Sequence, residues 1–340
     1  MKVDRTQLLT ELEMVSPGLS SRDIIEQSGC FVFTGNDVMT FNDEIACTHS
    51  TCLKIKGAVQ AEPLLAILRK LTDDTLRFNV TTGEEGTELV ISGKKRRAGM
   101  TMEKEVLLPI DTVDKPKKKK WKKMPNDYAD AISYVKDCAG KDQTRFSLTC
   151  IHIHPDYIEA CDGYQIGRYK TNFAVKRPVL VPKESLGYIE SLGMSEIGET
   201  KNWMHFRNAN GLVLSCRRYV EDYRDLTEML DKAKGTSIKL PKGVKEAAER
   251  AEVFTDDSVS DNQIKLQLRQ NEVRVSGTGT NGWYKEKRRM TYKGPKLSFF
   301  VSPALLTKLI DKYESCEIES NQLSVRLGKF QYLTVLTDVE

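Results

Sequence analysis

The feature that most constrains the fold is a weak internal repeat with a period of about 120 residues. A proline opens a short amphipathic segment at Pro63, Pro182 and Pro303, and these prolines lie 119 and 121 residues apart. Proline suits the first turn of a helix, where its missing N–H has no intrahelical partner to lose. Apolar residues then follow at helical spacing, at Leu64, Leu65, Leu68 and Leu71 in the first copy and at Leu305, Leu306, Leu309 and Ile310 in the third.

A second helix and two hairpins belong to the same repeat. Apolar stripes at helical spacing begin at Leu8, Tyr128 and Val244. Alternating segments separated by turn residues follow each helix and predict strand pairs. The first pairs are 30–33 with 38–41, 150–153 with 157–160, and 264–268 with 273–275; the second are 76–80 with 88–91, 203–206 with 212–215, and 316–318 with 323–325. One repeat therefore contains two helices and about eight strands in about 115 residues.

This order predicts an α+β fold of three tandem domains, each with two helices packed on antiparallel sheets. The predicted bounds are 1–114, 124–234 and 235–340, with a basic linker at 115–123. Three such domains can join edge to edge, and a closed ring would leave no strand edge open to aggregation. The alternative is three independent domains on a string, which the short connectors without a Gly/Ser-rich tract disfavour.

Composition limits the function classes. Hydrophobic residues make up 39% and charged residues 29% of the 340 residues, which is typical of a globular protein with real cores. No apolar run approaches the roughly 18 residues of a membrane span. Charged residues among the first fifteen argue against a secretory signal, so we expect a cytoplasmic protein whose eight dispersed cysteines remain thiols. The net charge of +4 neither requires nor excludes nucleic acid.

Several short motifs occur in a defined order. The second repeat contains Ala-Cys-Asp-Gly-Tyr-Gln-Ile at 160–166, Val-Leu-Val-Pro-Lys at 179–183 and Asp-Tyr-Arg at 222–224; the third contains Phe-Val-Ser-Pro-Ala-Leu-Leu at 300–306. In order and spacing these resemble the bacterial DNA polymerase III beta sliding clamp over nearly the whole chain. The resemblance implies a head-to-tail homodimer of six domains, with twelve helices lining a pore around double-stranded DNA. It also implies an ATP-driven clamp loader, a hydrophobic cleft for DNA polymerase, no catalytic residues and no cofactor.

A ring that slides on DNA needs diffuse positive charge, because phosphate contacts position a protein without reading bases. The candidate DNA-binding residues are Arg5, Arg22, Arg69, Lys70, Lys136, Lys141, Arg145, Lys183, Lys242, Lys245, Arg250, Lys308 and Lys312. For each of them, an ordinary solvated surface charge is the alternative. Glu184 and Glu190 in the second proline-led helix depart from the basic helix of the resembling family.

The resemblance also assigns two protein-binding surfaces. The matching cleft positions are Leu148, Gly163, Tyr164, Gln165, Ile166, Leu226, Leu333, Val335 and Leu336. Ring closure would bring Met100 and Met102 of one chain near Val253 and Phe254 of the other, although all four suit an ordinary core. The cleft departs from the family at Gln165 and Asp225, where the family has arginine, and at 337–338, where it has Met-Arg. Such divergence fits a clamp from a phage or another mobile replicon with its own polymerase.

Other patterns allow different interpretations. The dense basic run 115–123 is either a nucleic-acid patch or a solvated linker, and Trp121 within it either stacks on a base or anchors the linker. Cys and His at 47, 49 and 52, and again at 150, 152 and 154, lack the paired Cys-x-x-Cys spacing of a zinc site, so we expect no metal. No phosphate-binding loop or nucleophile elbow occurs. The rival functions are a clamp-fold accessory or inhibitory scaffold that does not encircle DNA and, more weakly, a nuclease or another enzyme built on the repeated unit.

Overall fold

The computed structural model describes residues 1–20, 25–84, 86–117, 120–232, 235–241, 243–255, 263–313, 315–319 and 321–338. The contacts between residues divide the chain into two compact units. Unit 1 contains Met1–Lys136, Thr149–Tyr157 and Thr171–Glu221, and unit 2 contains Asp137–Leu148, Ile158–Lys170 and Asp222–Glu340. This division does not test the three domain ranges expected from the sequence, which stay a prediction.

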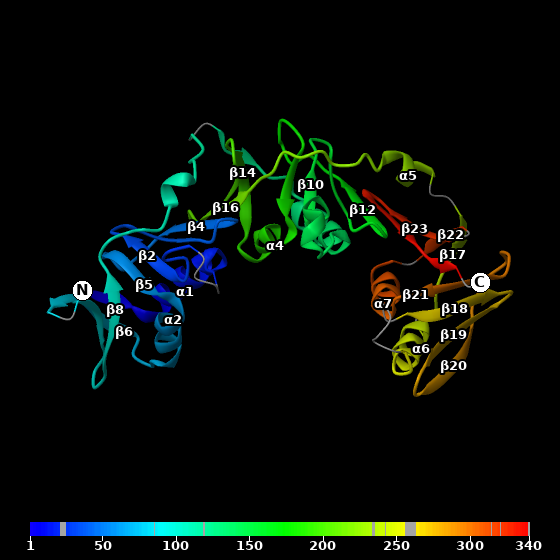
Figure 1. Ribbon diagram of the computed structural model, residues 1–340, viewed down its shortest axis with the longest axis horizontal. Coiled ribbons are helices and arrows are strands. Elements are labelled where there is room, and N and C mark those ends of the chain that lie inside the picture. The colour runs from blue at the N-terminus through cyan, green and yellow to red at the C-terminus, as the bar shows by residue number, and fades with distance from the viewer. Residues whose placement is uncertain are drawn as a thin grey trace. The chain divides into compact units, whose positions relative to one another are not determined.

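Unit 1 combines four helices with a long antiparallel sheet (Figure 1). The helices are α1 (Arg5–Val15), α2 (Ala61–Lys70), α3 (Tyr128–Val135) and α4 (Lys183–Ser191). The 12-stranded sheet runs in the order β1 (Lys2–Asp4), β6 (Thr75–Gly83), β7 (Gly86–Ser92), β8 (Arg97–Glu103), β5 (Lys56–Gln60), β2 (Cys30–Thr34), β3 (Asp37–Phe41), β4 (Ile45–Ser50), β16 (Val213–Arg217), β15 (Trp203–Asn208), β14 (Met194–Glu199) and β9 (Lys122–Lys123). Two further strands pair with each other, β10 (Cys150–Ile153) and β13 (Val179–Pro182).

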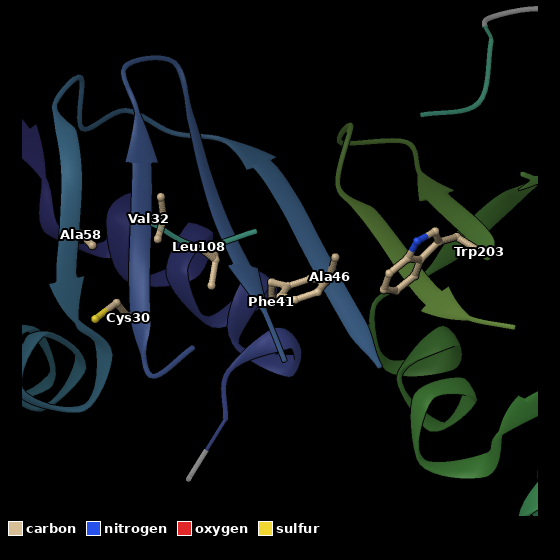
Figure 2. Packing of buried hydrophobic residues seen from close by; sticks show 7 residues of the cluster. All are labelled: Cys30, Val32, Phe41, Ala46, Ala58, Leu108 and Trp203. Atoms are coloured by element: carbon tan, nitrogen blue, oxygen red, sulfur yellow. The ribbon is translucent and has the colours of Figure 1, made fainter. Parts of the chain in front are cut away.

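The pairing of β4 with β16 continues the sheet from the first repeat into the second. The two strands are antiparallel, with Thr48 opposite Val213 and Ile45 opposite Cys216. Beside this join Trp203 is 1% exposed, and its ring centroid lies 6.0 Å from that of Phe41 (Figure 2). The indole Nε1 donates a hydrogen bond to the carbonyl oxygen of Thr112 at 3.2 Å, so its one polar group is satisfied. The expectation that neighbouring repeats join through strand edges is confirmed at this point.

Unit 2 contains α5 (Thr227–Lys232), α6 (Gly243–Glu252) and α7 (Pro303–Lys312). Its five-stranded sheet runs in the order β20 (Gly282–Arg289), β19 (Glu272–Gly279), β18 (Ile264–Arg269), β21 (Leu297–Val301) and β25 (Thr337–Asp338). A second set of strands contains β11 (Tyr157–Cys161), β12 (Gln165–Lys170), β24 (Phe330–Val335), β23 (Gln322–Leu327), β22 (Cys316–Glu319) and β17 (Thr236–Ile238). The antiparallel pairing of β12 with β24 joins the second repeat to the third.

The expected helices occur in pairs: α1 contacts α2, α3 contacts α4, and α6 lies beside α7 (Figure 1). The buried face of α6 consists of Val244 and three alanines, at 247, 248 and 251. These small side chains let the helix approach β19 closely: a Cβ added to Gly277 would lie 1.9 Å from the carbonyl oxygen of Ala251. Close approach therefore requires glycine at this position.

The helix starts agree with the expectation for two of the three prolines and differ slightly for one. Helix α7 begins at Pro303, and α4 begins directly after Pro182, whereas α2 begins at Ala61, two residues before Pro63. All three positions lie within or beside the first turn, where the absent N–H costs no helical hydrogen bond. No helix of the described residues is long and apolar enough to cross a membrane.

Candidate partner-binding cleft

Four of the nine residues predicted for the cleft meet in one apolar cluster within unit 2. We call Cys161, Ile166, Leu226, Leu230 and Leu333 the cleft cluster; each of them is at most 6% exposed. The half-buried side chains of Leu148 and Tyr223 pack against it. The cluster joins the end of β11, the start of β12, strand β24 and the segment around α5. The sequence analysis missed Cys161, Tyr223 and Leu230, although Leu230 follows Leu226 at the i+4 spacing of a helical face.

The other predicted cleft residues lie beside this cluster and differ in exposure. Tyr164 is 73% exposed and Val335 is 46% exposed, whereas Leu336 is 2% exposed. The backbone N–H of Val335 donates to the carbonyl oxygen of Tyr164 at 2.9 Å, so the end of β24 is fixed to the turn before β12. An exposed aromatic and an exposed valine next to a buried apolar cluster form a surface suited to an apolar peptide side chain.

The turn that presents Tyr164 is held by a network of side-chain hydrogen bonds. Gly163 has a φ of +97°, a conformation that glycine adopts without strain. The Asp162 carboxylate accepts from the N–H groups of Tyr164 and Gln165, both at 2.9 Å, and from the Gln165 amide at 2.8 Å. Burial raises the pKa of Tyr332, so its hydroxyl stays protonated and donates to Gln165 Oε1 at 2.9 Å. The glutamine that replaces arginine in the motif therefore has a structural role in this chain.

A buried ion pair supports the start of α5. The Arg168 guanidinium and the Glu159 carboxylate lie 2.7 Å apart, with side chains 6% and 1% exposed. Arg168 Nη1 also donates to the Thr227 hydroxyl at 3.1 Å, which ties β12 to the first residue of α5. Hydrogen bonds from the Thr227 hydroxyl and from the Thr227 backbone N–H, the latter at 2.9 Å, hold the pKa of the Asp225 carboxyl below its usual range. Asp225, another departure from the motif, therefore fixes the start of this helix.

Several predicted DNA-binding residues are engaged in contacts within the chain. Arg5 donates to the carbonyl oxygens of Leu68 and Asp73, each at 3.2 Å. Three more form ion pairs: Arg69 with Glu13 at 2.8 Å, Lys245 with Asp311 at 2.7 Å, and Arg250 with Glu286 at 2.7 Å. The three carboxylates neutralise part of the charge that a duplex would meet, and the carbonyl contacts hold the Arg5 side chain within the chain.

The remaining DNA candidates differ in accessibility. Lys70, Lys141 and Arg145 are exposed, and Lys136 and Lys183 are half-buried. Arg22 and Lys242 lie outside the described residues, as do the side chains of Lys308 and Lys312. Together α1, α2, α3, α4, α6 and α7 contain eight Lys or Arg and ten Asp or Glu, so these helices carry no excess of positive charge.

Comparison with solved structures decides the fold. No protein-family model matches the chain, and no curated protein matches it by sequence. A DNA polymerase III beta chain from Streptococcus pneumoniae is 15% identical and superposes with a TM-score of 0.84 over 99% of both chains. A sliding clamp from Bacillus subtilis gives 15% identity and a TM-score of 0.81, covering 100% of this chain and 99% of its own. A putative beta subunit from Eubacterium rectale gives 15% and 0.82, covering 99% and 98%.

This chain has the bacterial sliding-clamp fold. The fold class expected from the repeat and the resemblance is thereby confirmed over the full length.

The four residues predicted for a dimer contact have different surroundings on this sliding-clamp fold. Val253 is 75% exposed, and Phe254 beside it stacks on Tyr284 with ring centroids 6.3 Å apart. Met100 is half-buried on β8, whereas Met102 is 3% exposed. Met102 is therefore a core residue of the single chain, and the contact between chains stays a prediction.

Four of the six Cys and His residues of these motifs are buried in this sliding-clamp fold, and Cys52 and His154 are half-buried. Burial raises the pKa of the Cys47 thiol to about 12, so the thiol stays protonated and is a poor metal ligand. Within the described ranges, no group of three or more His, Cys, Asp or Glu has a geometry that could hold a metal ion.

Proposed function

We propose that this chain is a DNA polymerase processivity factor that encircles duplex DNA as a head-to-tail homodimer in the cytoplasm. One observation carries the proposal: the sliding-clamp fold extends over 99 to 100% of the chain in each of the three comparisons. Two sheet joins, β4 with β16 and β12 with β24, support it because a ring requires continuity between repeats. A closed ring retains DNA by topology, so tight binding to one site is not needed.

The cleft cluster supplies the second part of the proposal. Exposed Tyr164 and Val335 border buried Ile166 and Leu333, which offers apolar contacts to a short peptide of a polymerase. An ATP-driven loader would open the ring. The hydrogen bonds of Asp162 and Gln165 fix the turn that carries Tyr164, so little ordering accompanies binding.

Two measurements test the ring. Light scattering should give twice the 38.5 kDa mass of the chain. With its loader, the protein should remain on nicked circular DNA and be lost when the circle is linearised. A monomer that binds circular and linear DNA alike would rule the ring out.

A second candidate function has its own supporting observation. The six paired helices carry ten acidic and eight basic residues, and this balance also suits a clamp-fold scaffold that binds replication proteins without encircling DNA. Such a scaffold would bind a polymerase peptide through the cleft cluster but would not be retained on a nicked circle, so the same experiment separates the two functions.

A further inference from the structure

A pocket of about 620 Å³ lies in unit 1, and none of the described residues that line it is assigned above to DNA, partner or dimer binding. Its floor is apolar and comes from Val175, Ile197 and Met204, which are 7%, 3% and 0% exposed. Its walls come from β14, the segment before β13 and the end of the basic run at 115–123. Pockets of this volume accommodate a small ligand or one segment of a larger one.

The pocket has a strongly positive rim. Among the described residues that line it, six are cationic and one, Glu199, carries a carboxylate; the cations are Lys120, Lys122, Lys176, Arg177, Lys201 and Arg218. Like charges brought together in a concave, partly apolar surface repel one another and focus the local field. An anionic ligand relieves that repulsion.

Arg218 points to the same ligand chemistry independently. Its side chain is 14% exposed, and its Nη1 donates to Glu199 Oε2 at 3.2 Å. Its Nε is buried and has no hydrogen-bond partner in the protein. Guanidinium groups bind phosphoryl oxygens through charge-assisted hydrogen bonds, and only the exposed part of this side chain can make one to a ligand in the pocket.

The walls of the pocket are fixed within the fold. Lys122 belongs to β9, which pairs with β14, and its Nζ donates to the carbonyl oxygen of Ala174 at 2.7 Å. The Arg207 guanidinium lies 4.5 Å from the ring centroid of Trp121, so the tryptophan anchors the basic run to the sheet. The run is therefore not only a solvated linker, since its last two residues form a strand and its tryptophan is packed.

We propose that this pocket binds consecutive phosphate groups, supplied either by a single-stranded DNA backbone or by a free polyphosphate. Consecutive phosphate groups place a negative charge at every unit of the ligand, and several cations on the rim of the pocket can bind them together. An extended acidic peptide turns successive side chains to opposite faces and cannot direct each carboxylate inward. None of the described residues that line the pocket is aromatic and could stack on a base, so the phosphates supply the recognition. The inference does not depend on the proposed clamp function.

The test uses the full-length protein and two probes, sodium tripolyphosphate by calorimetry and a labelled oligothymidylate by fluorescence anisotropy. The variant Lys176→Glu/Lys201→Glu should lower affinity about tenfold, because it reverses two rim charges. Arg218→Lys keeps the charge but removes the planar guanidinium, and should lower affinity about fivefold. The matched control Lys285→Glu/Lys287→Glu reverses two exposed lysines on β20 in unit 2, and should change affinity by less than about twofold.

The two probes distinguish the source of the phosphates. Binding of the oligothymidylate alone assigns the pocket to a DNA backbone, and binding of tripolyphosphate alone assigns it to a free polyphosphate. Equal losses of affinity in the rim variant and the β20 control would overturn the proposed site, because affinity would then depend on the net charge of the protein. Failure of both probes to bind would also overturn it, as would displacement of tripolyphosphate by a hexaglutamate peptide at equal concentration.

Discussion

Arg168 and Glu159 form an ion pair of 2.7 Å in the interior of unit 2, where their side chains are 6% and 1% exposed. Arg168 also donates to Thr227 at the first residue of α5, next to Leu226 of the cleft cluster. One wall of the proposed peptide site therefore depends on a buried charge pair as well as on apolar contacts. Buried pairs are stable only when both partners are present.

The first prediction follows from this pair. Glu159→Leu should lower the free energy of unfolding by about 3 to 5 kcal/mol, because it removes the carboxylate that forms the buried ion pair with the Arg168 guanidinium. Urea denaturation followed by circular dichroism measures the loss. The double variant Glu159→Leu/Arg168→Met should recover most of it, since no uncompensated charge remains. A double variant as unstable as the single one would contradict this account.

The second prediction concerns the join between β4 and β16. Trp203→Ala should destabilise unit 1 by about 3 to 5 kcal/mol, because it leaves a cavity beside Phe41 in a fully buried core. The matched control is Trp283→Ala: Trp283 is 65% exposed, and its loss should change stability by less than about 0.5 kcal/mol. Thermal melting of both variants measures the difference, and similar melting temperatures would contradict the assigned role of Trp203.

The third prediction is a dependence of stability on pH. Burial lowers the pKa of His205 from 6.5 to about 4, so the imidazole is neutral in the folded protein. Between pH 6.5 and 4 the unfolded chain binds more protons, and stability falls as the pH falls through this window, by up to about 3 kcal/mol. Carboxylates titrate over part of the same range, so the measured quantity is the difference from His205→Gln. Parallel stability curves for the two proteins would contradict the prediction.

The repeat predicted the fold because its signals are local. Apolar spacing at Leu8 and Val244 and the turn at Asn271, whose φ is +58°, each specify one element without reference to the rest of the chain. Edge-to-edge joining also followed from the repeat. The pairing partner of β9 did not, because two lysines next to a tryptophan carry no strand periodicity.

The site could be predicted only in part. Motif positions identified Ile166 and Leu333, but they did not identify Arg168 with Glu159, since two opposite charges nine residues apart meet only when β11 and β12 are folded. The candidate DNA-binding residues were chosen by charge alone, and charge does not show what each side chain contacts. Arg5 and Arg69 look like free surface cations in the sequence, yet a carbonyl oxygen or a carboxylate from a distant segment accepts their hydrogen bonds.

The fourth prediction tests the cleft. Tyr164→Ala should weaken binding of a polymerase-derived clamp-binding peptide about tenfold, because aromatic side chains dominate such contacts. Its effect on stability should be small, since the side chain is 73% exposed. Tyr188→Ala on α4, which is 38% exposed and outside the cleft, is the matched control and should leave peptide affinity unchanged. Equal peptide affinity for Tyr164→Ala and the wild type would remove the cleft from the proposed function.

The fifth prediction concerns salt. Direct binding to phosphates weakens steeply as salt rises, in proportion to the number of charges neutralised, whereas a closed ring is held by topology. The paired helices carry eight basic and ten acidic residues, so the duplex would add little electrostatic attraction inside the ring. We therefore expect the half-life on nicked circular DNA to change less than about threefold between about 50 and 200 mM salt. Over the same range, the affinity of a protein held by several phosphate contacts falls by orders of magnitude. Gel filtration of the loaded complex measures this half-life, with the linearised circle as control. A half-life on the intact circle that falls steeply as salt rises would show that charge, and not ring closure, holds the DNA.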